Sequence, residues 1–213
     1  MNDPRSSPAS ASKRRVVVFD LGGVLLDWNP RHLYRKLFAG DDAAMENFLA
    51  NVCTTAWNER QDEGRTFAEA VEALLPAHAA QRELIEAFGQ RFGEMVAGPI
   101  HGSVEVLSDL KRRAVPLYAL SNWSAETFPP QRERFEFLAW FDGIVISGAE
   151  RVKKPDARIF QRLFARYGIE PQSAVFIDDV ERNAAAASAL GMHGVHFRSP
   201  QQLRRELAQL GLI

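Results

Sequence analysis

Short apolar runs recur along the chain, and the first of them, at residues 16–20, is rich in β-branched residues. They span residues 16–20, 116–121, 143–147, 174–178 and, more weakly, 193–197. Runs that stay apolar at successive positions are typical of strands buried on both faces of a parallel sheet. The segments between them carry apolar residues at helical spacing, as at Val104, Leu107 and Leu110. Alternating strands and helices predict an α/β fold, a doubly wound parallel sheet with helices on both faces.

One long segment interrupts this alternation. Residues 28–98 contain no convincing strand, but they repeat apolar residues at helical spacing, as at Phe67, Ala70, Val71 and Leu74. The segment is too long for a loop. We therefore expect an inserted helical cap at 28–98 and an α/β core formed by residues 15–27 and 99–213. Residues 1–14 are rich in Ser, Pro and charge, and they predict a mobile tail.

The composition is that of an ordinary globular protein. Of 213 residues, 46% are hydrophobic and 25% charged, and 27 acidic residues against 26 basic ones leave a net charge of −1. This balance gives no support for nucleic acid as a partner. Cys53 stands alone, which excludes an internal disulfide and favours a buried apolar role. No apolar run approaches the roughly 18 residues of a membrane span, and the N-terminus lacks a signal-peptide core. We expect a cytoplasmic protein that does not bind membranes.

Chemically useful side chains follow the predicted strands where each strand ends. They are Asp20, Ser121-Asn122, Lys153-Lys154 and Asp178-Asp179. Ligands of open parallel sheets bind at this edge. Acids on neighbouring strands could coordinate Mg²⁺. A hydroxyl, an amide and an ammonium group could donate hydrogen bonds to a phosphoryl oxygen. A carboxylate could then attack phosphorus.

The order of these segments resembles that of the haloacid dehalogenase-like hydrolases, a superfamily dominated by Mg²⁺-dependent phosphatases. The matching motifs are FDLGGVLLD (19–27), ALSN (119–122), KKPDARIF (153–160) and VFIDDVERN (175–183). The resemblance covers nearly all of residues 15–213, and the inserted helices are similar to the small cap of one subgroup. Within the superfamily, the chain looks most like sugar-phosphate phosphatases of the glucose-1-phosphate phosphatase type. These also carry a Gly-containing first motif and a Trp after the second motif, here Trp123.

The resemblance implies a role for each motif residue that handles the phosphoryl group. Asp20 is the expected nucleophile, which forms an aspartyl-phosphate. Ser121 is expected to hydrogen-bond the phosphoryl group, helped by backbone N–H groups near Asn122. Lys154, which directly precedes a proline, is preferred over Lys153 as the charge-balancing lysine, and Lys153 is expected to be solvated. Trp123, together with Trp28 and Trp57, could line a sugar-binding pocket or pack in the core.

The resemblance also implies a Mg²⁺ site. Asp20, the backbone carbonyl of Gly22 and Asp179 are the expected direct ligands. Asp178 is expected to bind either directly or through water. Asn183 could orient this site or face solvent.

The chain departs from the family pattern at Gly22. Most phosphatases of the superfamily carry a second Asp there as general acid and base, and glycine cannot transfer a proton. The cap acids Glu59, Asp62 and Glu63, or Asp27, could replace it. Alternatively, the leaving group could need less help, as a sugar anomeric oxygen does.

These patterns predict a Mg²⁺-dependent phosphatase that hydrolyses a small phosphomonoester, with a sugar phosphate as candidate, through an aspartyl-phosphate. Two alternatives stay open. A metal-independent 2-haloacid dehalogenase would also lack the second Asp, because halide leaves without a proton, but the pair Asp178-Asp179 argues against it. A catalytically weak binding or regulatory module is the other alternative. The sequence does not set the oligomeric state.

Overall fold

The computed structural model describes residues 16–213, so the expected N-terminal tail lies outside the described residues. Its centre is a five-stranded sheet in the order β5-β4-β1-β6-β7, and every neighbouring pair is parallel. The strands are β1 (Val16–Phe19), β4 (Leu117–Ser121), β5 (Gly143–Ile146), β6 (Ala174–Asp178) and β7 (His193–His196). Each coincides with one of the apolar runs, so the predicted α/β sheet is confirmed.

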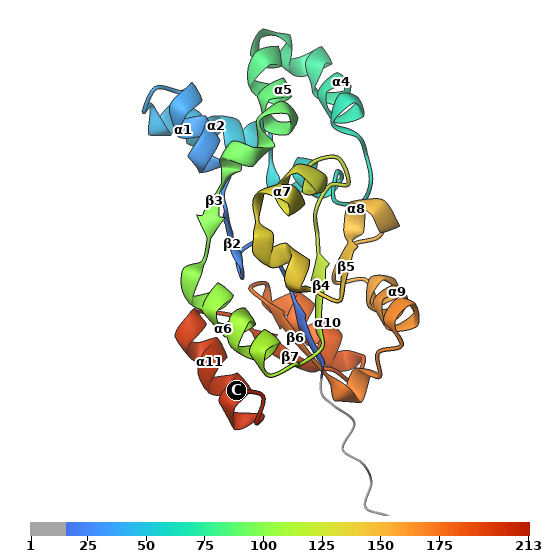
Figure 1. Cartoon of the computed structure of the whole chain (residues 1–213). Helices are drawn as coiled ribbons and strands as arrows, with labels where there is room; N and C mark the ends of the chain where they lie inside the picture. The colour runs from blue at the N-terminus through green and yellow to red at the C-terminus, as the bar shows by residue number, and fades with distance from the viewer. Residues whose placement is uncertain (1–15) are drawn as a thin grey trace, which may run out of the picture.

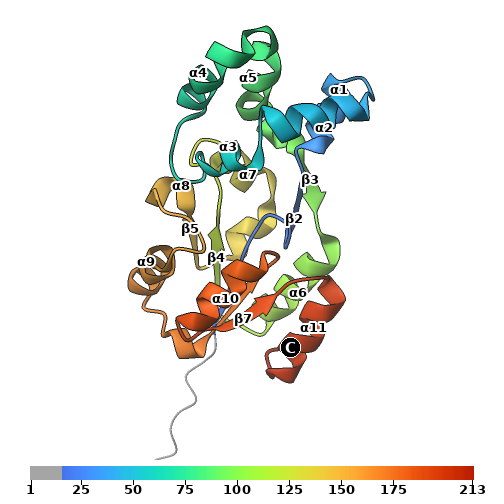
Figure 2. The same ribbon diagram turned by 180° about the vertical axis from the view of Figure 1, so that it is seen from behind.

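Helices cover both faces of this sheet (Figures 1 and 2). The helices after the cap segment are α6 (His101–Arg112), α7 (Phe128–Arg134), α8 (Ser147–Glu150), α9 (Ala157–Tyr167), α10 (Glu181–Ala189) and α11 (Pro200–Gln209). Successive residues of β1 point to opposite faces. Val17 and Phe19 join the apolar core with α6 and α11, while Val18 packs on the side of α9. Burial of each such side chain contributes about 1.5–3 kcal/mol, which explains why this strand is apolar throughout.

The helices of the inserted segment lie together beyond one end of the sheet (Figure 1). They are α1 (Arg31–Leu37), α2 (Asp42–Asn51), α3 (Thr55–Glu59), α4 (Phe67–His78) and α5 (Arg82–Gln90). Thr66 and Glu69 form a reciprocal capping box that begins α4, and Asp41 caps the first turn of α2. We propose that residues 28–98 form a cap that is distinct from the core, and we call this segment the cap.

Two short strands at the ends of the cap segment are absent from the sequence-based prediction. β2 (Leu26–Trp28) and β3 (Val96–Pro99) form an antiparallel pair. The expectation that residues 28–98 contain no strand was therefore wrong at both ends of this segment. Each strand is too short to show a periodic pattern, and its partner lies some 70 residues away in the chain. The pair brings the entry and the exit of the cap segment side by side above the sheet (Figures 1 and 2).

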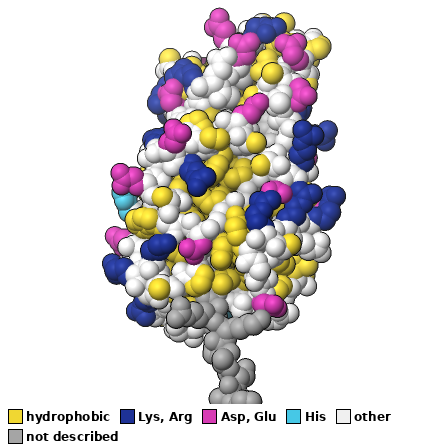
Figure 3. All heavy atoms as spheres, turned by 45° about the vertical axis from the view of Figure 1, so that its right-hand side comes forward, with side chains coloured by type: hydrophobic (Ala, Val, Ile, Leu, Met, Phe, Trp, Pro, Cys, Tyr) yellow, Lys and Arg dark blue, Asp and Glu magenta, His cyan; other side chains and the backbone are white. Residues whose placement is uncertain are grey.

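The surface carries charges of both signs. On the face turned forward in Figure 3, basic and acidic side chains surround a largely apolar band, and no continuous basic area covers the described residues there. Among residues 16–213, no helix combines the length and apolarity that a membrane crossing requires.

Candidate active site

Asp20 lies directly after β1, at the edge of the sheet where the parallel strands end. Its backbone N–H donates to the carbonyl of Ile177, which extends the β1–β6 ladder by one residue (2.8 Å). Its Oδ1 accepts hydrogen bonds from the Ser121 hydroxyl (2.6 Å) and from the Leu21 N–H (2.7 Å). Its Oδ2 lies 2.9 Å from Nζ of Lys154. These contacts fix the carboxylate of Asp20, which is only 7% exposed.

Lys154 is completely buried at the centre of the site. Its ammonium donates to Oδ2 of Asp178 (2.6 Å) and to the carbonyl of Leu120 (2.9 Å), in addition to the contact with Asp20. The three donors of the ammonium group are thus all used. Burial lowers the pKa of Lys154, but Asp20 and Asp178 outweigh this effect and raise it overall, so the lysine stays charged.

Asn122 holds the backbone of Lys154 in place. Its side-chain oxygen accepts from the Lys154 N–H (2.8 Å), and its side-chain nitrogen donates to the Lys154 carbonyl (3.1 Å). The motif at residues 119–122 therefore positions the motif at residues 153–160 through one amide side chain. This explains why an amide follows Ser121 at the end of β4.

The pKa of Asp20 is raised to about 7, first by burial. Lys154 opposes this shift, and the nearby Asp178 and Asp179 add to it. The site thus holds more negative charge than its single buried lysine balances. A further cation would favour the carboxylate form of Asp20.

Three acidic side chains form a cluster that suits a metal ion. Asp20, Asp178 and Asp179 each offer a carboxylate oxygen, and these oxygens lie within 4.8 Å of one another. Carboxylate oxygens are the ligands that Mg²⁺ prefers. The excess of buried negative charge shows that this donor set fits a divalent cation.

The two acids after β6 differ in their surroundings. Asp178 is fully buried, and its Oδ1 accepts from the Val180 N–H (2.8 Å) and from the side-chain amide of Asn183 (3.0 Å). Asn183 thus orients the site instead of facing solvent. Asp179 is exposed as a residue. Its carboxyl group is nevertheless partly buried, and this burial and the charge of Asp178 raise its pKa. Asp178 is committed to protein contacts, which leaves Asp179 better placed to bind an ion.

The turn after Asp20 lies directly against Asp179. Gly23 has a φ of +71°, and a Cβ atom there would lie 2.2 Å from Oδ2 of Asp179. Only glycine fits this position without moving the carboxylate. Gly22, which precedes Gly23, thus belongs to a turn that packs against the acidic cluster.

The side chain of Trp123, an expected substrate-binding residue, lies in the apolar core. Its ring packs against Phe92 and Phe128, and its indole N–H donates to the Thr127 hydroxyl. The residue is 4% exposed and belongs to the main apolar core. Of the two roles open for Trp123, the structure thus favours packing in the core, and a contact with the substrate stays a prediction.

Lys153 also differs from expectation, because it is not simply solvated. Its ammonium pairs with Glu59 (3.0 Å) and Glu63 (3.2 Å) of the cap. Arg182 of α10 pairs with Glu59 as well (3.2 Å). The sequence offered no signal for Arg182, because its partner lies in a distant segment. These ion pairs join the cap to the core beside the site.

The fold and the site together define an α/β protein of hydrolase type with a buried carboxylate directly after its first strand. The family model for haloacid dehalogenase-like hydrolases matches residues 14–191, and the chain belongs to this family.

Curated relatives include phosphatases. The chain is 26% identical to the sesquiterpene phosphatase astK of Aspergillus oryzae, over 92% of this chain and 96% of the relative. It is 26% identical to phosphoglycolate phosphatase of Escherichia coli, over 85% and 80% of the two chains. It is also 27% identical to mouse acyl-CoA dehydrogenase family member 10, but it spans only 19% of that protein.

Solved structures share the fold. An enzyme of this family from Bacteroides thetaiotaomicron, solved with magnesium and inorganic phosphate, has a TM-score of 0.67 at 21% identity. The match covers 88% of this chain and 96% of that one.

Proposed function

We propose that this hydrolase is a Mg²⁺-dependent phosphatase that cleaves a small phosphomonoester through an aspartyl-phosphate on Asp20. The observation that carries this proposal is the clustering of Asp20, Asp178 and Asp179 around one buried lysine. An anionic substrate would be repelled by three carboxylates unless a cation were bound with it. Two relatives are phosphatases by name, which supports the same chemistry.

The residues of the site have distinct tasks in this reaction. Asp20 attacks phosphorus in line, and the bond from phosphorus to the leaving oxygen breaks. The Ser121 hydroxyl, which lies 2.6 Å from Asp20, can turn its donor to a phosphoryl oxygen. Lys154 balances the charge of Asp20 and Asp178 throughout. Asp20, Asp179 and the Gly22 carbonyl would hold Mg²⁺, with Asp178 behind them, and the ion would neutralise phosphoryl oxygens.

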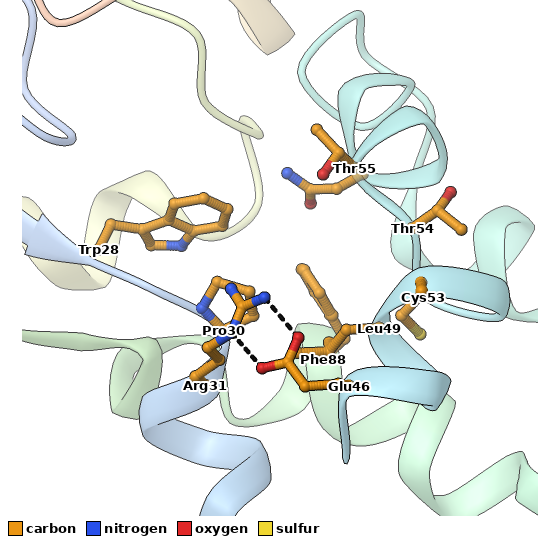
Figure 4. A pocket seen from close by; sticks show the side chains of 11 residues that line it. Trp28, Pro30, Arg31, Glu46, Leu49, Cys53, Thr54, Thr55 and Phe88 are labelled. Atoms are coloured by element: carbon orange, nitrogen blue, oxygen red, sulfur yellow. Dashed lines mark hydrogen bonds and ion pairs between the residues drawn. The ribbon is translucent and has the colours of Figure 1, made fainter. Parts of the chain in front are cut away.

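A cavity of about 220 Å³ in the cap is the proposed site for the leaving group. One of its lining residues, Trp28, lies close to the turn after Asp20, because its Cβ is 3.9 Å from the position of a Cβ on Gly22. Figure 4 shows Trp28 across the cavity from Thr55, with Leu49, Cys53 and Phe88 along its walls. The cavity is smaller than the roughly 300–1,000 Å³ typical of drug-sized ligands. It therefore suits a compact leaving group.

The charges around this cavity favour a neutral leaving group. Arg31 and Glu46 pair with each other through two contacts, and the longer measures 2.6 Å (Figure 4). The other lining residues are apolar, hydroxyl or amide side chains. The indole N–H of Trp28 is buried without a hydrogen-bond partner among the described residues, so it could donate to a hydroxyl. A sugar or polyol phosphate fits this lining better than a substrate with a second anionic group.

The test is phosphate release from a panel of substrates. Sugar phosphates, phosphoglycolate and p-nitrophenyl phosphate are incubated with Mg²⁺ or with a chelator, using the wild type and Asp20→Asn. We expect turnover that the chelator and the substitution both abolish, with sugar phosphates ahead of phosphoglycolate. No release from any ester would overturn the phosphatase proposal. Halide release from 2-haloacids would then support the dehalogenase, which Gly22 also permits.

A further inference from the structure

One acidic side chain of the cap, near the site, has no partner among the described residues. Asp62 lies in the turn that follows α3 and is partly buried. Its carboxylate makes no hydrogen bond or ion pair with any other residue of the described chain. The flanking acids differ from it, since Glu59 and Glu63 both pair with Lys153. An acid held between two anchored neighbours, and itself unpaired, is available to a substrate.

The anchors hold the turn that carries Asp62 against the segment that contains Lys154. Lys153, which holds both flanking acids, directly precedes Lys154 in the chain, and Lys154 contacts Asp20. On the other side of Asp62, Gly64 is pressed against the core, and a Cβ there would lie 2.9 Å from the Gly148 carbonyl. Figure 2 shows α3 just above α7 and α8, at the end of the sheet that carries the site.

The charges around Asp62 suit proton transfer. Burial is the main reason that its pKa is raised to about 7. Lys153 and Lys154 lower it, while Glu59 and Glu63 raise it. The influence of Lys154 means that Asp62 lies within the field of the ammonium that contacts the nucleophile. A carboxyl group with such a pKa can both give and take a proton near neutral pH.

The other candidate acids are less suitable. Gly22 has no side chain, and Asp27 pairs with His32 (3.2 Å) and has a 54% exposed side chain. Glu59 is committed to Lys153 and Arg182, and these contacts lower its pKa despite some burial. A group with a lowered pKa is a poor proton donor to a leaving oxygen.

We propose that Asp62 is the acid and base of this enzyme, supplied by the cap in place of the side chain missing at Gly22. The inference rests on the proposed phosphatase function. In the first step, Asp20 forms a bond to phosphorus, the bond to the leaving oxygen breaks, and protonated Asp62 gives its proton to that oxygen. In the second step, Asp62 takes a proton from the attacking water. The water oxygen bonds to phosphorus, the bond to Asp20 breaks, and phosphate leaves.

The test compares two leaving groups in the presence of Mg²⁺. A sugar phosphate leaves as a basic alkoxide that needs a proton, whereas p-nitrophenyl phosphate leaves as a weakly basic phenolate. We expect Asp62→Asn to lower turnover of the sugar phosphate by about 10²-fold or more. With p-nitrophenyl phosphate, it should release nitrophenolate in a burst of about one equivalent and then slow, because the second step lacks its base. Asp62→Glu should restore part of the sugar phosphate turnover.

Glu72→Gln, in α4 of the cap, is the matched control. It should change turnover of either substrate by less than about fivefold, because it removes one exposed ion pair with Arg82 that takes no part in holding Asp62. A fully active Asp62→Asn, or an equal loss on both substrates without a burst, would overturn the inference alone. A wild type that hydrolyses no ester would overturn the phosphatase function and the inference with it.

Discussion

The ammonium group of Lys154 lies 2.9 Å from Oδ2 of Asp20, and neither group has room to turn away. The lysine is fully buried, and its other contacts are Asp178 and a backbone carbonyl. One side chain thus holds together the ends of β1 and β6. The same contact that fixes the proposed nucleophile therefore also stabilises the sheet edge.

Replacing this lysine should cost stability as well as activity. Lys154→Met leaves two buried carboxylates without their counter-ion, so we expect the free energy of unfolding to fall by about 3–5 kcal/mol. Urea denaturation in the presence of a chelator measures the change. Lys153→Met is the control, and its partly exposed pairs should contribute about 1 kcal/mol or less. Equal losses in the two variants would contradict this account of Lys154.

Gly23→Ala should damage the metal site specifically. The new Cβ would overlap Oδ2 of Asp179, at 2.2 Å, and the φ of +71° adds strain. Gly40→Ala offers a matched control, because Gly40 has a φ of +87° but no atom of the described residues lies within 4 Å of the new Cβ. Both variants should lose roughly 1–2 kcal/mol of stability from strain. Only Gly23→Ala should weaken Mg²⁺ binding, by about tenfold or more, in calorimetric titration. Unchanged affinity would show that Asp179 does not hold the ion.

Asp62→Asn should make the protein more stable at high pH. The folded-state pKa of about 7 exceeds the ordinary value of 3.8, so the folded protein binds more protons than the unfolded chain between these values. Ionised Asp62 therefore destabilises the fold increasingly as pH rises from about 4 to 7. We expect Asp62→Asn to gain about 1–2 kcal/mol at pH 8 and little at pH 4, measured by urea denaturation. A gain confined to low pH would have the wrong sign.

Cys53 should resist alkylation in the folded protein. Burial raises the pKa of its thiol to about 12, although Tyr34 lowers it slightly. At pH 8 only about one thiol in ten thousand would be ionised, and the thiolate is the reactive form. Mass spectrometry after iodoacetamide treatment should show slow labelling in native buffer and fast labelling in urea. Equally fast labelling in both would mean that the cavity wall around Cys53 opens readily.

A carboxylate introduced at position 22 should restore activity to the Asp62→Asn variant. A Cβ at Gly22 meets only Trp28, at 3.9 Å, so an added side chain has room to start toward the leaving group. We expect the double variant Gly22→Asp, Asp62→Asn to regain sugar phosphate turnover by about tenfold or more over Asp62→Asn. Gly22→Asn in the same background should not rescue it, because an amide cannot transfer the proton. Rescue by both would point to packing instead of acid–base chemistry.

Local pattern was sufficient to predict the sheet. The runs at residues 16–20 and 174–178 are apolar because both of their faces are buried, and this requirement acts on each residue separately. The rule that parallel strands end at one edge then brought Asp20, Ser121 and Asp178 together without any knowledge of side-chain angles. The structure places these three side chains in one connected set of contacts through Lys154.

The orientation of single side chains could not be predicted in the same way. Trp123 follows the second motif directly, yet its ring turns into the core against Phe92 of the inserted segment. The β2–β3 pair was missed for a similar reason, since each strand is defined by a partner far away in the chain. Such contacts depend on how the inserted segment returns to the sheet, which no local pattern encodes.

The sequence by itself determined the α/β sheet and the acids, hydroxyl and lysines at its edge, because burial and strand ends are local properties. It left four cap and loop acids as equal candidates for the missing proton donor. The tertiary structure separated them. Glu59 and Glu63 pair with Lys153, which lies 94 and 90 positions away in the chain, and Asp27 pairs with His32, whereas Asp62 has no partner within residues 16–213. The protonation of a carboxyl group depends on its burial and on the charges around it, and only the folded chain sets these.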